Sequence, residues 1–184
     1  ANGFRAAGLV PGDRVAIAMP MTVQAVAGYL GIVKAGGVVV SIADSFAPGE
    51  IQTRLELAGA DAVITQGAIH RGRRTLPMYA KVLEANAPRA IVVEPEPDQL
   101  REGDLDWEAF LGPTEPFEAV EVSGDAYMNI LFSSGTTGTP KAIPWTHLSP
   151  IKSAMDAHFH HDVHPGDVLA WPTNLGWMMG PGLI

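Results

Sequence analysis

Short apolar runs alternate with amphipathic stretches along the first third of the chain. The apolar run 14–19 follows a Pro-Gly-Asp turn and stops at Pro20, which is typical of a strand buried on both faces. Residues 21–35 carry apolar side chains three and four positions apart. This spacing predicts a helix whose buried stripe consists of Val23, Val26, Ala27, Leu30 and Val33. Gly36-Gly37 ends the helix, and the run 38–42 predicts a second strand.

The same alternation continues to about residue 93. Pro48 suits the first turn of a second helix, which carries Ile51, Leu55 and Ala58 on one face and ends at Gly59. Further strands are predicted at 62–64 and 90–93, with a weaker helix at 78–84 between them. Strands separated by helices pair in parallel through crossover connections. The pattern therefore predicts an α/β fold, with a doubly wound, mostly parallel sheet and helices on both faces.

Residues 94–125 interrupt this alternation of strands and helices. They begin with the acidic, proline-containing stretch 94–98 and are predicted to form a long surface connection, with one helical turn near 107–111. The pattern then resumes with a strand at 126–132, a glycine-rich turn, a helix at about 147–159 and a strand at 168–171. All of this fits one partial domain over residues 1–184.

Composition narrows the functional classes. The chain has 184 residues, of which 47% are hydrophobic and 17% charged. Its net charge is -8, so it lacks the excess of positive charge that is typical of proteins that bind nucleic acid. No apolar stretch is long enough to span a membrane. The absence of cysteine excludes a disulfide scaffold and a thiolate site, and it is compatible with the cytoplasmic location that we expect. The chain begins with Ala1 rather than Met, in residues that resemble the last turns of a helix, and it stops at Ile184 without a polar tail or a capping signal, so we expect a fragment of a longer protein.

One segment points to chemistry: Ser133-Ser134-Gly135-Thr136-Thr137-Gly138-Thr139-Pro140-Lys141. It follows a predicted strand, and α/β sheets bind ligands at the carboxyl ends of their strands. Glycines let successive N–H groups converge on an anion, while hydroxyls and one lysine add donors and charge. The loop therefore suits a polyphosphate, although loops rich in Ser, Gly and Thr are also common as plain surface connections. It is not a Walker loop, because two residues rather than four separate its glycines and Pro140 precedes the lysine.

This nine-residue loop resembles the AMP-binding signature of the adenylate-forming superfamily, which includes acyl-CoA synthetases, luciferases and the adenylation domains of peptide synthetases. The resemblance extends over nearly the whole chain, through residues 8–17 and the Lys-Ala-Gly-Gly at 34–37. Residues 171–177 are similar to an Asp-hydrophobic-Gly-Trp segment near the acyl pocket of the acetyl-CoA synthetase branch. Residues 141–146 together with 174–179 resemble plant-type acyl-activating enzymes.

The resemblance implies a two-step reaction. A small carboxylic acid attacks the α-phosphate of ATP and releases pyrophosphate, and the acyl-adenylate then passes to the thiol of coenzyme A, with Mg²⁺ as cofactor. The resemblance assigns the β- and γ-phosphates to Ser133, Ser134, Gly135, Thr136, Thr137, Gly138 and Lys141. It also makes Asn174, Gly176 and Trp177 candidates for substrate binding, although core packing is an equal interpretation of Trp177. Ala142 departs from the glycine usual in the family.

The groups that the family uses later in the chain are absent from these 184 residues. They are the Thr-Glu segment for adenine and Mg²⁺, the ribose-binding Asp, the hinge and the catalytic lysine of the C-terminal lid domain. We therefore expect no catalytic residue and no metal ligand here, and no turnover by this chain alone. Two alternatives stay open: acyl transfer to a carrier protein, and a non-catalytic nucleotide- or phosphate-binding fragment. The histidines at 158, 160, 161 and 164 are interpreted as a solvated helix end, and we expect self-association through apolar surfaces near the chain ends.

Overall fold

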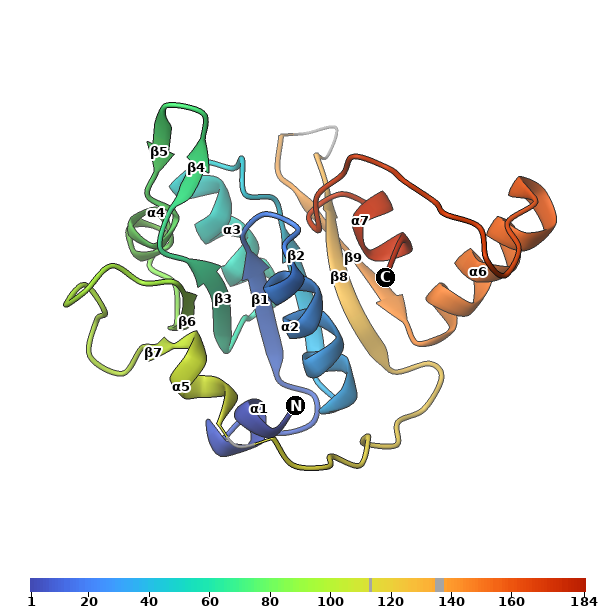
Figure 1. Cartoon of the computed structure of the whole chain (residues 1–184), viewed down its shortest axis with the longest axis horizontal. Coiled ribbons are helices and arrows are strands. Elements are labelled where there is room, and N and C mark those ends of the chain that lie inside the picture. Colours follow the sequence, from blue (N-terminus) through green and yellow to red (C-terminus); the bar gives the residue numbers. More distant parts are fainter. Residues whose placement is uncertain (113, 135–137) are drawn as a thin grey trace.

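A computed structural model describes residues 1–112, 114–134 and 138–184. Its centre is a seven-stranded sheet in the order β7-β6-β3-β1-β2-β8-β9 (Figure 1). The first six of these pair in parallel, and β9 runs antiparallel to β8 at the edge. This result confirms the predicted mostly parallel sheet. The strands are β1 Arg14–Ala18, β2 Val38–Ile42, β3 Ala62–Gln66, β6 Arg89–Val93, β7 Leu105–Asp106, β8 Tyr127–Ser133 and β9 Lys141–Thr146.

Helices cover both faces of the sheet, as the alternating pattern predicts. On one face α1 (Asn2–Ala6), α2 (Val23–Lys34) and α5 (Trp107–Leu111) bury Phe4, Tyr29 and Trp107 against the sheet. On the other face α3 (Pro48–Ala58) and α4 (Met78–Glu84) bury Ile51 and Val82. The strands between them are apolar on both sides because both of their faces are covered.

Local signals explain where the helices begin and end. The hydroxyl of Thr22 accepts a hydrogen bond from the backbone N–H of Ala25 at 3.2 Å and so caps the start of α2. The Glu50 carboxylate accepts from the N–H of Ala47 at 2.9 Å, and Pro48 occupies the first turn of α3. Gly59 ends α3 with φ of 60°, a left-handed conformation that favours glycine.

The predicted buried stripe of α2 is wrong. The buried residues are Ala25, Gly28, Tyr29 and Ile32, whereas Val23 is 83% exposed and Leu30 is 51% exposed. Close packing is the reason: a Cβ on Gly28 would lie 2.8 Å from Cδ1 of Ile64, so a larger residue here would force the Ile64 side chain to shift. A pattern that counts large apolar residues does not register such small contact positions.

The second half differs from its prediction in three places. The expected strand at 168–171 does not form, and Val168 is 94% exposed. The edge next to β8 is taken by β9, which was not predicted because Pro144 interrupts its pattern. Proline is tolerated on an edge strand, where one side of the backbone has no partner. The expected connection at 94–125 contains the predicted helical turn as α5, and it also contains one short strand that was not predicted, β7.

Three further elements complete the described chain. A separate antiparallel hairpin, β4 (Ile69–Arg71) with β5 (Arg74–Leu76), was not predicted and protrudes from the body (Figure 1). Helix α6 (Leu148–His161) agrees with the predicted helix, but none of its residues is buried, and α7 (Met179–Gly182) lies near the C-terminus. Among the described residues, no helix combines the length and apolarity that crossing a membrane requires.

Candidate functional site

The carboxyl end of β8 carries the first half of the predicted phosphate loop. Ser133 is the last residue of β8, Ser134 follows it exposed to solvent, and the chain returns through Gly138 into β9. Ser133 is the register partner of Lys141 across the two strands, so the two ends of the loop lie side by side. Gly138 has φ of 83°, which requires glycine in practice. The other predicted ligands, Gly135, Thr136 and Thr137, lie outside the described residues.

A cavity of about 320 Å³ lies between this loop and α3. Ser134, Gly138 and Pro140 line one side, and Gly176 and Trp177 also contribute to its wall. The predicted phosphate loop and the predicted substrate segment therefore share a cavity, although about forty residues separate them in the sequence. The remaining lining comes from Phe46, Gly49, Glu50, Thr53, Arg54 and Phe132.

Arg54 is a lining residue that sequence reasoning missed. Its side chain is buried, with its guanidinium carbon 3.8 Å from the ring centroid of Phe46 and 5.7 Å from that of Phe132. Nη1 donates to the backbone oxygen of Glu50 at 2.7 Å. Burial lowers the pKa of Arg54, and the Glu50 carboxylate acts in the opposite direction. The burial of Arg54 could have been predicted from the sequence, because position 54 falls on the same face of α3 as Ile51, Leu55 and Ala58.

Residues 174–177 attach to the carboxyl end of β2 through a compact set of polar contacts. The Asn174 side chain donates from Nδ2 to the Asp44 carboxylate at 2.7 Å, and its Oδ1 accepts from the N–H of Gly176 at 2.8 Å. Lys81 donates to the backbone oxygen of Asp44 at 2.9 Å. Leu175 is completely buried between these contacts. The Asn174 side chain therefore makes hydrogen bonds within the protein that hold the turn in place.

Trp177 points away from the core. Its side chain is 56% exposed, and its ring lies 6.4 Å from that of Phe46 between centroids. Ordinary core packing, the alternative interpretation of this tryptophan, therefore does not describe its surroundings. Gly176 next to it packs directly on the main chain of Ala43. The turn thus presents a large aromatic side chain beside the loop cavity.

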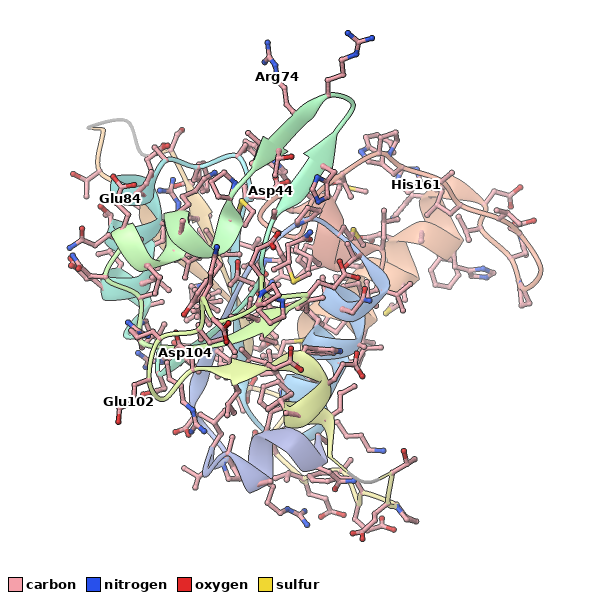
Figure 2. All side chains as sticks on the ribbon, turned by 60° about the vertical axis from the view of Figure 1, so that its left-hand side comes forward. Asp44, Arg74, Glu84, Glu102, Asp104 and His161 are labelled. Carbon is pink, nitrogen blue, oxygen red and sulfur yellow. The ribbon has the colours of Figure 1, made fainter. Side chains whose placement is uncertain are left out.

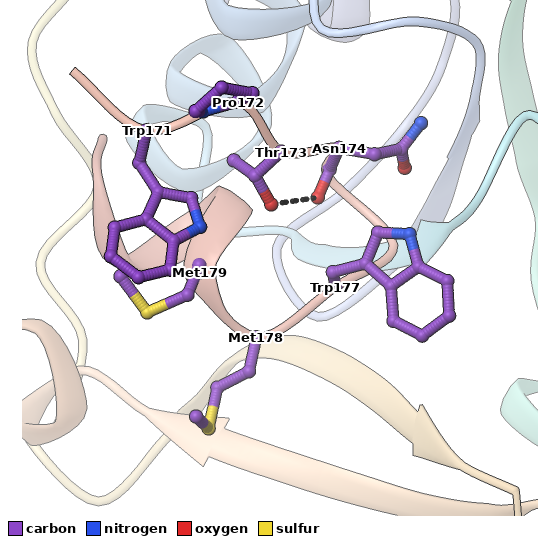
Figure 3. A pocket seen from close by; sticks show the side chains of 7 residues that line it. All are labelled: Trp171, Pro172, Thr173, Asn174, Trp177, Met178 and Met179. Carbon is purple, nitrogen blue, oxygen red and sulfur yellow. Dashed lines mark hydrogen bonds between the residues drawn. The ribbon is translucent and has the colours of Figure 1, made fainter.

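A second hollow, of about 510 Å³, lies on the other side of the same segment (Figure 3). Trp171, Trp177, Met178 and Met179 provide most of its apolar surface, and Thr173 and Asn174 provide polar atoms. Figure 3 shows the Thr173 hydroxyl directed at the backbone oxygen of Asn174, 3.5 Å away. Methionine and tryptophan offer an adaptable apolar wall, which suits the aliphatic part of an organic acid.

The exposed Arg74 and the histidines at 158, 160, 161 and 164 do not line either of these cavities. Arg74 projects from the β4–β5 hairpin, away from the body of the molecule (Figure 2). His158 and His164 have ring nitrogens 3.1 Å and 2.8 Å from the backbone oxygens of Val163 and Asp162. Within the described ranges, no group of three or more His, Cys, Asp or Glu side chains is placed to hold a metal ion.

A doubly wound sheet with a glycine-containing loop at a strand's carboxyl end is typical of α/β domains that bind nucleotides, and the spacing of the glycines in this loop is not that of a Walker loop. The comparison with protein families shows to which family the chain belongs. The model of the AMP-binding enzyme family matches residues 1–184, so the chain belongs to this family. The predicted family is therefore confirmed.

Similar proteins include plant acyl-activating enzymes and bacterial CoA synthetases. The chain is 54% identical to "Probable acyl-activating enzyme 17, peroxisomal" of Arabidopsis thaliana, covering 100% of this chain and 27% of that protein. It is 53% identical to hexanoyl-CoA synthase of Cannabis sativa, covering 96% and 26%. Among solved structures, acetoacetyl-CoA synthetase from Streptomyces lividans superimposes with a TM-score of 0.89 at 29% identity, covering 99% of this chain and 29% of that one. The chain thus spans between a quarter and a third of the length of these proteins.

Proposed function

We propose that this chain is the pyrophosphate-binding part of an AMP-forming acyl-CoA synthetase. In the first step a carboxylate oxygen attacks the α-phosphorus of ATP, the bond from the α-phosphorus to the bridging oxygen breaks, and pyrophosphate leaves. In the second step the thiol of coenzyme A attacks the acyl carbon, AMP leaves and the thiol proton is released. The observation that carries the proposal is the shared cavity, which joins Ser134 and Gly138 of the loop to Gly176 and Trp177.

In this proposal the loop binds the β- and γ-phosphates. Ser133 and Ser134 supply hydroxyl donors, Gly138 supplies backbone freedom, and Lys141 supplies a positive charge at the opposite end of the loop. Gly135, Thr136 and Thr137 keep the phosphate-binding role that the resemblance implies. Mg²⁺ is usually bound through substrate phosphates, water and few carboxylates, so it needs no protein cage in this segment.

The hollow at Trp171 to Met179 is proposed as part of the acyl site. Its apolar wall and its volume of about 510 Å³ favour a small or medium aliphatic acid. The names of similar proteins, hexanoyl-CoA synthase and acetyl-coenzyme A synthetase, support the same size range. Asn174 takes a positioning role here, because both ends of its amide are engaged by Asp44 and Gly176.

Coenzyme A is the proposed acceptor because the similar proteins with printed activities are CoA synthetases. Transfer to a carrier protein would use the same first step and stays an alternative. The proposed location is cytoplasmic, whereas two plant relatives are named peroxisomal. Fluorescence microscopy of a tagged full-length protein distinguishes the two compartments, and punctate peroxisomal signal would overturn the cytoplasmic assignment.

Acid-dependent ATP–pyrophosphate exchange tests the proposal. The full-length enzyme carrying this segment should exchange pyrophosphate into ATP only when a suitable acid from acetate to octanoate is present, and residues 1–184 alone should not. Lys141→Ala should reduce exchange, whereas Lys152→Ala on exposed helix α6 should not and serves as the matched control. If the folded full-length protein shows no exchange with any acid of the panel, the result would favour a non-catalytic phosphate-binding fragment. Exchange by the 184-residue chain itself would contradict the expectation that the catalytic groups lie elsewhere.

A further inference from the structure

Arg54 is a buried cation that forms no direct ion pair with a carboxylate in the part of the chain that the structure describes, although Glu50 lies near enough to act on its pKa. It is 7% exposed. Buried arginines are normally paired with a carboxylate, because an isolated buried charge is costly. Glu50, one helical turn away, directs its carboxylate to the N–H of Ala47 at 2.9 Å instead. The charge of Arg54 is therefore available to an anion that is not part of this chain.

The hydrogen bonds of the guanidinium leave donors unused. Nη1 donates to the backbone oxygen of Glu50 at 2.7 Å. Nε is buried without a hydrogen-bond partner, and no hydrogen bond of Nη2 occurs among the described residues. A buried donor without a partner is unfavourable, and Nη2, which is not fully buried, can bind water or an anion in the cavity.

The surroundings of Arg54 fix where its unused donors can act. Phe46 covers the guanidinium at 3.8 Å, and Phe132, at the end of β8, lies 5.7 Å away. A guanidinium held by aromatic rings loses little freedom when it binds, and its planar fork matches the spacing of phosphate oxygens. Arg54 lines the loop cavity together with Ser134 and Gly138, whereas the hollow at Trp171 to Met179 does not include it. This placement favours a phosphate over the carboxylate of the acid substrate.

We propose that Arg54 binds a phosphate oxygen of ATP, and of the pyrophosphate that is released, from the α3 side of the cavity opposite Ser134 and Gly138. The inference rests on the proposed acyl-adenylate chemistry and adds a ligand from a helix that lies about eighty residues before the loop. Arg54 thus complements the phosphate loop as a second, pre-oriented cation. It is a binding residue, and the acid substrate is not its ligand.

The test uses Arg54→Gln and Arg54→Lys in the full-length enzyme carrying this segment, with Lys152→Gln on exposed helix α6 as the control. Calorimetric titration with magnesium pyrophosphate should show an affinity loss of about 10- to 100-fold for Arg54→Gln, because a charge-assisted hydrogen bond is lost. Arg54→Lys should lose less, since it keeps the charge without the planar fork. In the exchange assay, KM for pyrophosphate should rise while KM for the acid stays within about twofold of the original.

Separate outcomes test the inference and the proposed function. Unchanged pyrophosphate affinity in a folded Arg54→Gln protein would mean that Arg54 only packs against its aromatic neighbours. If the glutamine variant does not fold, the lysine variant decides, and wild-type affinity together with wild-type KM for pyrophosphate would overturn the inference. A raised KM for the acid alone would assign Arg54 to the carboxylate and also overturn it. Failure of the unmodified enzyme to exchange with any acid would instead count against the proposed function.

Discussion

Gly176→Ala provides a sharp test of how the substrate segment is attached. A Cβ at this position would lie 2.1 Å from the backbone nitrogen of Ala43, 2.6 Å from its Cα and 2.7 Å from the carbonyl carbon of Ile42. All three are main-chain atoms at the carboxyl end of β2, and ordinary contacts at a Cβ begin at 3.4 Å. Strand β2 is held between β1 and β8, so it cannot yield. The segment at 174–177 must therefore move away from the sheet.

The cost follows from what this movement breaks. Overpacking against a fixed neighbour costs about 1–3 kcal/mol, and the hydrogen bond between Asn174 and the Asp44 carboxylate contributes about 1.5–3 kcal/mol. The fully buried Leu175 would also become exposed in part. We therefore expect a loss of about 3–5 kcal/mol in the stability of this attachment, which is a large fraction of the total stability of a typical domain.

Hydrogen exchange and denaturation measure the effect together. In Gly176→Ala, the amides of residues 174–180 should exchange much faster, and the free energy of unfolding should fall if the segment unfolds with the core. Gly182→Ala is the control, because a Cβ there meets nothing within 4 Å, and it should change stability by less than about 0.5 kcal/mol. Protection of the segment and a free energy of unfolding equal to those of the unmodified chain would refute the steric reasoning.

Three further variants, one of them a double substitution, test other parts of the structure. Asn174→Asp places a second carboxylate beside Asp44, where the amide now lies 2.7 Å away, and should destabilise the chain by about 2 kcal/mol at neutral pH. Urea denaturation at neutral pH measures this loss, and a free energy of unfolding equal to that of the unmodified chain would contradict it. Burial raises the pKa of Tyr29, whose hydroxyl has no hydrogen-bond partner among the described residues. Because the unfolded chain then releases this proton first, stability should fall above about pH 10, and Tyr29→Phe should fall less steeply in alkaline denaturation. Ile151→Glu with Phe159→Glu, at exposed positions of α6, should reduce the self-association that we expect, and unchanged sedimentation would assign it to another surface.

The sheet was largely predictable because its strands are buried on both faces. Residues 14–18, 38–42 and 89–93 are mainly apolar runs, and the helices α2 and α3 begin at recognisable caps. The prediction was wrong where small residues determine which face of a helix is buried, and where a strand lies at the edge of the sheet. Gly28 lies on the face of α2 that contacts the sheet, and this face carries few large apolar side chains that a pattern could detect. Pro144 lies on an edge strand, and proline is not expected inside a central strand.

The site was predictable as separate segments but not as an assembly. The loop at 133–141 and the segment at 174–177 each have a local signature, so their residues could be proposed from sequence. Their common cavity depends on how the segment attaches to Asp44 at the end of β2, which is a tertiary contact across 130 positions. Arg54 was missed for the same reason, because the burial of a charged side chain depends on the rings of Phe46 and Phe132 around it.

The nucleotide products of the full-length enzyme test the central claim most directly. With ATP, Mg²⁺, coenzyme A and an accepted acid, the account predicts equal amounts of AMP, pyrophosphate and acyl-CoA thioester, resolved by chromatography over a single time course. Formation of ADP and phosphate with the thioester would mean a different phosphoryl-transfer step and would contradict the assignment of the loop to a departing pyrophosphate.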